Sequence, residues 1–115
     1  MESLVTQLRN TNGVIFYNPD FKDFLEMNMA DLRKASLENA PIFELSDTQR
    51  ARATRNFNLL CNMANVPFHL HWVTLRVNNL YRYSDYRPSM MDIYKVDSEK
   101  LAELQLKFME SQSIT

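Results

Sequence analysis

Glycine is almost absent from this chain of 115 residues, since Gly13 is its only example. Globular proteins contain about 7% glycine on average. The loops that hold nucleotide phosphates need closely spaced glycines, because the backbone must approach the ligand there. The sequence therefore excludes a glycine-rich loop of the Walker or dinucleotide-binding type.

Cysteine and histidine are also scarce, with one cysteine and two histidines in the chain. Cys61 is the only cysteine, so no disulfide can form within the chain and a reducing compartment is expected. With His69 and His71 it falls short of the four ligands that structural zinc takes. Cys61 lies near the core face of a predicted helix, where a buried thiol is inert. We expect no metal, no cofactor and no catalytic site, and hence no enzyme.

Long apolar runs are missing as well. The N-terminus lacks the charged segment and apolar stretch of a signal peptide, and no run is long enough for a membrane span. Hydrophobic residues nevertheless make up 45% of the chain, which is typical of a globular protein. Its length predicts one domain with a modest core.

Lysine is absent from residues 48–91, although this segment is basic. Its six arginines and one acid give a balance of +5, whereas residues 1–47 carry −4 and residues 92–115 carry −2. Arginine's planar fork suits fixed pairing and interfaces better than a lysine ammonium does. The segment could fold against the acidic flanks, contact another protein or bind nucleic acid, and the charge pattern alone leaves these three open.

Two amphipathic helices are predicted in the first half of the chain. Asn18-Pro19-Asp20 has the residues of a helix start, which predicts a helix over about 20–37 that ends near Pro41. Before it, residues 13–17 (GVIFY) suggest a short extended piece. Ser46 with Gln49 has the form of a capping box, followed by an apolar stripe that predicts a helix over about 47–63.

Residues 68–88, FHLHWVTLRVNNLYRYSDYRP, fit two different structures. A β-hairpin would turn at Asn78-Asn79, but this turn lacks the glycine that tight hairpins favour, and His69 and His71 would fall on the apolar face. A helix from Pro67 would instead pack between two layers. Its opposite faces would carry Phe68, Trp72 and Leu75 on one side and Leu70, Val73 and Val77 on the other. We therefore favour the helix.

Two short strands and a last helix complete the predicted elements. Residues 41–45 (PIFEL) favour extended structure and residues 90–96 (MMDIYKV) alternate as a strand does. Ser98 is the expected cap of a helix that runs to about residue 111. Its apolar arc covers half the circumference or more, which is wider than a helix on a small domain needs.

The order strand, helix, helix, strand over residues 42–97 resembles a LysM-type βααβ unit. It is similar in particular to the LysM-like segment of baseplate wedge proteins from contractile-tailed bacteriophages. The resemblance lies in DTQRARATRNFNLL, in VPFHLHWVTLRVNNL with its Trp72-Val73 and Asn78-Asn79-Leu80, and in DYRPSMMDIYKV. Two glycines of the pattern are replaced, around Ala64-Asn65 and at Ser89, and no proline follows Val96.

The resemblance implies an α+β fold. A small LysM-like βααβ unit (42–97) would be extended by an N-terminal segment with a helix (1–41) and by a C-terminal helix (98–115). It also implies a structural subunit of a virion, assembled in the host cytoplasm, that joins neighbouring tail proteins without catalysis. Glycan-binding relatives hold N-acetylglucosamine polymers, so a module of that kind is one alternative.

Tyrosine and arginine alternate in LYRYSDYR (80–87). Both residue types anchor protein interfaces, and they also stack on single-stranded nucleic acid, so a small nucleic-acid-binding protein is a second alternative. We favour other virion or tail proteins as partners, with no small-molecule substrate and no membrane. The predicted interface residues are Arg76, Tyr81, Arg82, Tyr83, Tyr86, Arg87, Leu106 and Met109. The predicted core residues are Phe57, Leu60, Phe68, Trp72 and Leu75.

Overall fold

Helices make up 66% of the protein, and the described part of the chain contains no strand or sheet. The computed structural model describes residues 14–90 and 92–113. The predicted α+β fold with a βααβ unit is therefore wrong. The elements are η1 (Val14–Tyr17), α2 (Pro19–Met27), α3 (Met29–Asn39), α4 (Asp47–Arg52), α5 (Phe57–Met63), η2 (Phe68–Leu70), α6 (His71–Val77), η3 (Tyr83–Asp85) and α7 (Ser98–Ser113).

The first predicted helix is two helices, α2 and α3, which meet at Asn28. The Asn18 side chain accepts a hydrogen bond from the backbone of Asp20 and caps the start of α2, as its sequence predicts. Asn28 leaves the helical conformation at φ −108°, and its side-chain amide donates to the Phe24 carbonyl. Because that amide satisfies a carbonyl at the end of α2, the chain can change direction there. The segment before α2 is the 3-10 helix η1 and not an extended piece.

The second predicted helix is also divided, into α4 and α5. Its capping box is present: Ser46 accepts from the Gln49 backbone, and the Gln49 side chain accepts from the Ser46 backbone. Helix α4 ends at Arg52 with Ala53 as its C-cap, and Arg55 takes a left-handed conformation with φ 62°. Asn56 then caps α5 by accepting from the backbone of Leu59.

Residues 68–77 are helical, in η2 and α6, so the helix alternative is confirmed and the hairpin is excluded. Helix α6 lies between two clusters of buried side chains. The first core consists of Phe16, Phe21, Leu25, Met29, Leu32, Val73, Val77, Leu101, Leu104 and Phe108. The second core consists of Ala53, Phe57, Leu60, Cys61, Leu75, Leu80, Tyr86 and Ile93. A helix with apolar residues on both faces therefore joins the two cores, as predicted. The predicted placement of Trp72 beside Leu75 is wrong, because Trp72 packs against the first core with Val73 and Val77.

The two predicted strands meet in a single antiparallel bridge, between Ile42 and Tyr94. The Phe43 amide donates to the Ile93 carbonyl (2.7 Å), and the Lys95 amide donates to the Pro41 carbonyl (2.9 Å). A longer ladder would next require an amide from residue 41, which proline lacks. The Tyr94 amide and carbonyl are both taken by the Asn78 side chain, at 2.7 and 2.8 Å. One polar side chain thus occupies the edge that another strand would use.

Helix α7 begins at Ser98, the residue that was predicted as its cap. The Asp97 carboxylate accepts a hydrogen bond from the Lys100 backbone (3.0 Å), so aspartate caps this helix and Ser98 does not. The Asp97 amide in turn donates to the Ser36 hydroxyl (2.9 Å), which joins α7 to α3.

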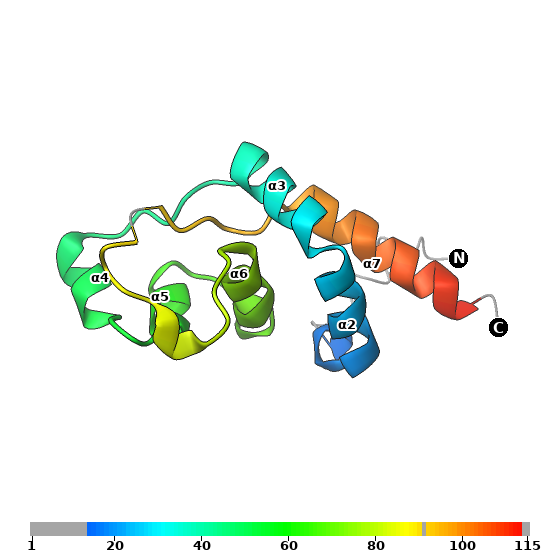
Figure 1. Ribbon diagram of the computed structural model, residues 1–115, viewed down its shortest axis with the longest axis horizontal. Helices are drawn as coiled ribbons and strands as arrows, with labels where there is room; N and C mark the ends of the chain where they lie inside the picture. The colour runs from blue at the N-terminus through cyan, green and yellow to red at the C-terminus, as the bar shows by residue number, and fades with distance from the viewer. Residues whose placement is uncertain (1–13, 91, 114–115) are drawn as a thin grey trace.

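The molecule is elongated, with extents of 49 × 25 × 25 Å. Figure 1 shows α4 and α5 at one end of the long axis and the C-terminal half of α7 at the other. No helix among the described residues is both long and apolar enough to cross a membrane.

Candidate interaction surface

Two of the predicted interface residues lie inside the protein. Tyr86 is fully buried in the second core, where its ring lies 6.3 Å from that of Phe57. Arg76 is only 9% exposed. The prediction that these two side chains face a partner is therefore wrong: both face residues of their own chain.

Arg76 can be buried because the groups around its guanidinium interact favourably with a positive charge. It pairs with the Glu26 carboxylate on α2 and donates to the Leu80 carbonyl (2.7 Å). The hydrogen bond to Glu26 is the main reason that the pKa of Arg76 is raised. The ring of Tyr81 lies 4.3 Å from the guanidinium carbon. Glu26, Leu80 and Tyr81 are thereby held together at the end of α6.

The C-terminus of α6 also receives an arginine from another helix. Arg33, on α3, donates to the carbonyls of Arg76 (2.9 Å) and Val77 (3.1 Å). These carbonyls belong to the last turn of α6, where a positive charge also complements the helix dipole. No local sequence pattern indicates this role of Arg33, because the contact spans more than forty residues.

Among the tyrosines and arginines of residues 80–87, the exposed side chains are Tyr81 and Arg82. Tyr81 is 73% exposed although its ring is packed on Arg76. Tyr83 is half-buried against the second core, and burial raises the pKa of its hydroxyl. Arg87 is half-buried and donates to the carbonyls of Ser84 (2.8 Å) and Tyr86 (2.9 Å). Fewer of the predicted interface residues in this segment are therefore exposed than the sequence suggested.

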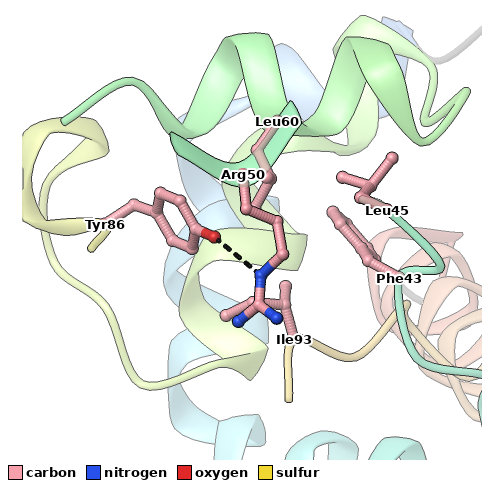
Figure 2. Close-up of a pocket in the computed structure, with 6 residues that line it drawn as sticks. All are labelled: Phe43, Leu45, Arg50, Leu60, Tyr86 and Ile93. Atoms are coloured by element: carbon pink, nitrogen blue, oxygen red, sulfur yellow. Dashed lines mark hydrogen bonds between the residues drawn. The ribbon is translucent and has the colours of Figure 1, made fainter. Parts of the chain in front are cut away.

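Arg50 holds the following loop in place. Its guanidinium donates to the carbonyls of Pro88 (3.0 Å) and Met90 (2.7 Å) and to the Tyr86 hydroxyl (3.5 Å). Figure 2 shows Arg50 and Tyr86 side by side over a small cavity. The cavity measures about 10 Å³, enough for about one water molecule and not for a substrate. It is lined by Phe43, Leu45, Arg50, Leu60, Tyr86 and Ile93.

The side chains considered for catalysis are placed for packing. Burial raises the pKa of Cys61 to about 12, so the thiolate that a nucleophile needs is scarce at neutral pH. His71 is buried: its Nε2 donates to the Val66 carbonyl (3.0 Å), and its Nδ1 lies 2.8 Å from the Asn58 amide oxygen. No group of three or more metal-binding side chains occurs among the described residues.

A larger open cavity of about 300 Å³ lies beside the β-bridge. Its charged lining residues are Glu44 and Lys95, one of each sign. A general acid–base pair needs two titratable groups that converge on a substrate. Glu44 and Lys95 carry opposite charges, and the other lining residues are Pro41, Ile42, Met63, Ala64 and Asn65.

Comparison with known proteins adds no relative. The chain matches no family model, no curated protein and no solved structure. Its function must therefore be argued from its own surface.

The predicted core residues divide into three groups. Phe57, Leu60 and Leu75 are buried in the second core. Trp72 is half-buried against the first core, with the Lys22 ammonium 5.5 Å from its ring. Phe68 is 69% exposed, so the prediction that it is buried is wrong. Phe68 belongs to the 3-10 helix η2, which precedes α6. It therefore does not lie on the apolar face that was predicted for one continuous helix.

Leu106 and Met109 lie on α7 and are partly buried. Leu101, Leu104 and Phe108 are the α7 side chains of the first core. The two outer residues thus lie beside the face that packs against α2 and α3, and not within it.

Proposed function

We propose that this protein is a non-enzymatic structural subunit that joins neighbouring proteins in a larger assembly. The observation that carries the proposal is Tyr81, which is 73% exposed while its ring is fixed 4.3 Å from the Arg76 guanidinium. An exposed aromatic ring that is already ordered loses little conformational freedom on binding. Tyrosine and arginine are also the residues that most often dominate binding energy at protein interfaces.

The order of Tyr81 has an identifiable cause. Arg76 is held by Glu26 from α2 and by the Leu80 carbonyl, so the surface under the ring is rigid. Arg82 is exposed next to it. An aromatic centre with a planar cation at its edge is the arrangement that recognises a protein surface with backbone carbonyls or carboxylates.

A phage tail baseplate is the assembly that the sequence favours. The resemblance to baseplate wedge proteins rests on residues 47–80 and no longer on a βααβ unit, because the strands of that unit are not formed. We propose a virion component that contacts other tail proteins and is assembled in the host cytoplasm.

Mass spectrometry of purified particles tests this proposal. The chain is expected in particles at a fixed stoichiometry. Tyr81→Ala should lose incorporation while the free protein stays folded, at a cost of about 0.5–1 kcal/mol for one exposed cation–π contact. Tyr81→Phe is the matched control: its ring can still pack on Arg76, so incorporation should persist. A chain that is absent from particles overturns the assembly role, and normal incorporation of Tyr81→Ala overturns the role of this residue.

A further inference from the structure

Three described residues other than glycine have a left-handed backbone: Arg55 (φ 62°), Asn65 (φ 61°) and Asn79 (φ 61°). This conformation is strained for an L-residue, because Cβ approaches a carbonyl oxygen. Asparagine is several-fold enriched there and arginine is not. Two of the three positions thus carry the residue that backbone geometry favours, and Arg55 is the exception.

The fold uses the backbone of Arg55 and not its side chain. The Arg55 amide donates to the Tyr86 carbonyl (2.9 Å), which any residue except proline could do. Its guanidinium is exposed and makes no hydrogen bond or ion pair with a described residue. Asparagine or glycine could supply the same amide with less strain. Folding therefore gives no reason for arginine at this position.

Two further arginines are close to Arg55. The Nη1 of Arg87 donates to the same Tyr86 carbonyl oxygen (2.9 Å) that accepts the Arg55 amide, so this guanidinium lies beside the Arg55 backbone. Arg52 is exposed at the end of α4, three residues before Arg55. The nearby acid of this segment, Asp85, already accepts a hydrogen bond from the Arg82 backbone (2.9 Å).

We propose that Arg52, Arg55 and Arg87 form a carboxylate-binding surface that docks onto an acidic face of a neighbouring protein subunit. The inference rests on the proposed assembly function and names the chemistry of one partner. The surface lies at the end of the molecule that holds α4 and α5, remote from the C-terminal half of α7 (Figure 1). Guanidinium groups bind carboxylates through two parallel hydrogen bonds, which gives the contact a direction as well as a charge.

A protein carboxylate fits this surface better than a nucleic acid does. Nucleic-acid-binding surfaces neutralise a run of phosphates and so extend over many basic side chains. Here the basic segment is flanked by residues 1–47 and 92–115, with balances of −4 and −2. A long polyanion that left the arginine surface would meet these acidic helices and be repelled.

Titration of the full chain with two probes of equal charge tests the inference. End-blocked hexaglutamate and heptathymidylate each carry six negative charges, and amide chemical shifts in the NMR spectrum detect weak binding residue by residue. Hexaglutamate should shift the amides of Arg52, Arg55 and Arg87, and it should bind more tightly than heptathymidylate. The inference is overturned if hexaglutamate leaves these amides unmoved. Tighter binding of heptathymidylate also overturns it, in favour of nucleic acid.

Substitution of Arg55 separates binding from folding. Arg55→Asn should weaken hexaglutamate binding about threefold, the loss expected for one exposed ion pair, and should raise the urea unfolding midpoint because the strain is relieved. Arg52→Gln should weaken binding without raising the midpoint. Lys34→Gln removes an exposed charge on α3 and should change neither measurement. A lower midpoint for Arg55→Asn would show that the side chain serves the fold, which overturns the inference.

The two proposals fail separately. If the chain enters particles but hexaglutamate does not bind, the assembly role stands and the carboxylate surface is wrong. If hexaglutamate binds at the three arginines but the chain is absent from particles, the surface stands and the proposed function is wrong.

Discussion

Arg76 shows how a charge can be buried in a small protein. Its guanidinium has a carboxylate from α2, a carbonyl from its own C-terminal turn and an aromatic ring as neighbours. The partners differ in exposure, since 38% of the Glu26 side chain is in contact with solvent. Substitution of Arg76 should therefore lower the stability of the protein more than substitution of Glu26 does.

We expect Arg76→Met to lower the free energy of unfolding by about 2–4 kcal/mol. The methionine keeps the apolar stem, but the buried Leu80 carbonyl loses its donor and Tyr81 loses its support. Glu26→Gln keeps a hydrogen-bond acceptor at a half-exposed position and should cost less than about 1 kcal/mol. Urea unfolding followed by circular dichroism measures both. Equal losses would contradict this account of the pair.

His69 should make stability depend on pH. Burial, and secondarily the charge of His71, lower its pKa in the folded protein below the ordinary value of 6.5. The unfolded chain therefore binds the proton more readily than the folded chain does. The stabilising contribution is complete above pH 6.5 and is lost as the pH falls through the lower pKa of the folded state.

The measurement is the urea midpoint at pH 7 and at pH 5. It should fall between these values in the unsubstituted protein and fall less in His69→Gln, which keeps His71 and every carboxylate as they are. An identical decrease in both proteins would assign the effect to other groups.

At the scale of elements, helix starts were predicted correctly from the sequence, whereas the positions at which helices break were not. The Asn18 cap, the Ser46 capping box and the helix after Pro67 follow from a few neighbouring residues, and all three are present. The breaks at Asn28 and Arg55 were missed. Asparagine at Asn28 and Asn56 was the available signal, because this residue interrupts helices and caps them.

The predicted strands failed for one reason within their own sequences and one outside them. Residues 41–45 and 90–96 have strand-like composition, and they do meet at one bridge. Pro41 lacks the amide that would extend the pairing past this residue. The side chain of Asn78, at the end of α6, occupies the opposite edge of Tyr94, where a third strand would have to pair. The interface was mispredicted in the same way, since Tyr86 and Arg76 are buried by distant residues. Long-range contacts cannot be deduced from local patterns.

Helix α7 carries the next prediction. Leu106→Ser together with Met109→Ser should lower the free energy of unfolding by less than about 2 kcal/mol, because both side chains are partly exposed and lie beside the first core. The variant should nevertheless lose incorporation into particles, if this flank of α7 meets another chain.

Leu104→Ser provides the comparison, because Leu104 is buried in the first core. This substitution should unfold the protein or destabilise it by about 3 kcal/mol or more. If the double variant also unfolds, the flank of α7 is core, and if it folds and still enters particles, the partner lies elsewhere. Circular dichroism and particle recovery measure the two properties independently.

At the scale of the whole molecule, the shared helix α6 makes the two cores interdependent. Val73 and Val77 pack in the first core and Leu75 packs in the second. Neither core can lose this helix without exposing apolar surface in the other. An elongated chain of this size is therefore expected to unfold as one unit.

Two probes can follow the unfolding of the two cores, one probe for each core. Trp72 fluorescence reports on the first core and the reaction of Cys61 with a thiol reagent reports on the second. Their urea transitions should coincide. Leu75→Ala should shift both to lower urea by an amount equivalent to about 2–4 kcal/mol. Two separate transitions, or a shift seen by only one probe, would show that the cores are independent.

The burial of Cys61 has a practical consequence for mapping partners. With a pKa of about 12, roughly one thiol in ten thousand is ionised at pH 8. The folded protein therefore behaves towards maleimides as if it contained no cysteine. A cysteine introduced beside a proposed contact, at the exposed Ala51 or Ser84, can carry a photo-crosslinker or a spin label without removal of the native thiol. Each of these contacts can thus be located chemically in an otherwise unaltered chain.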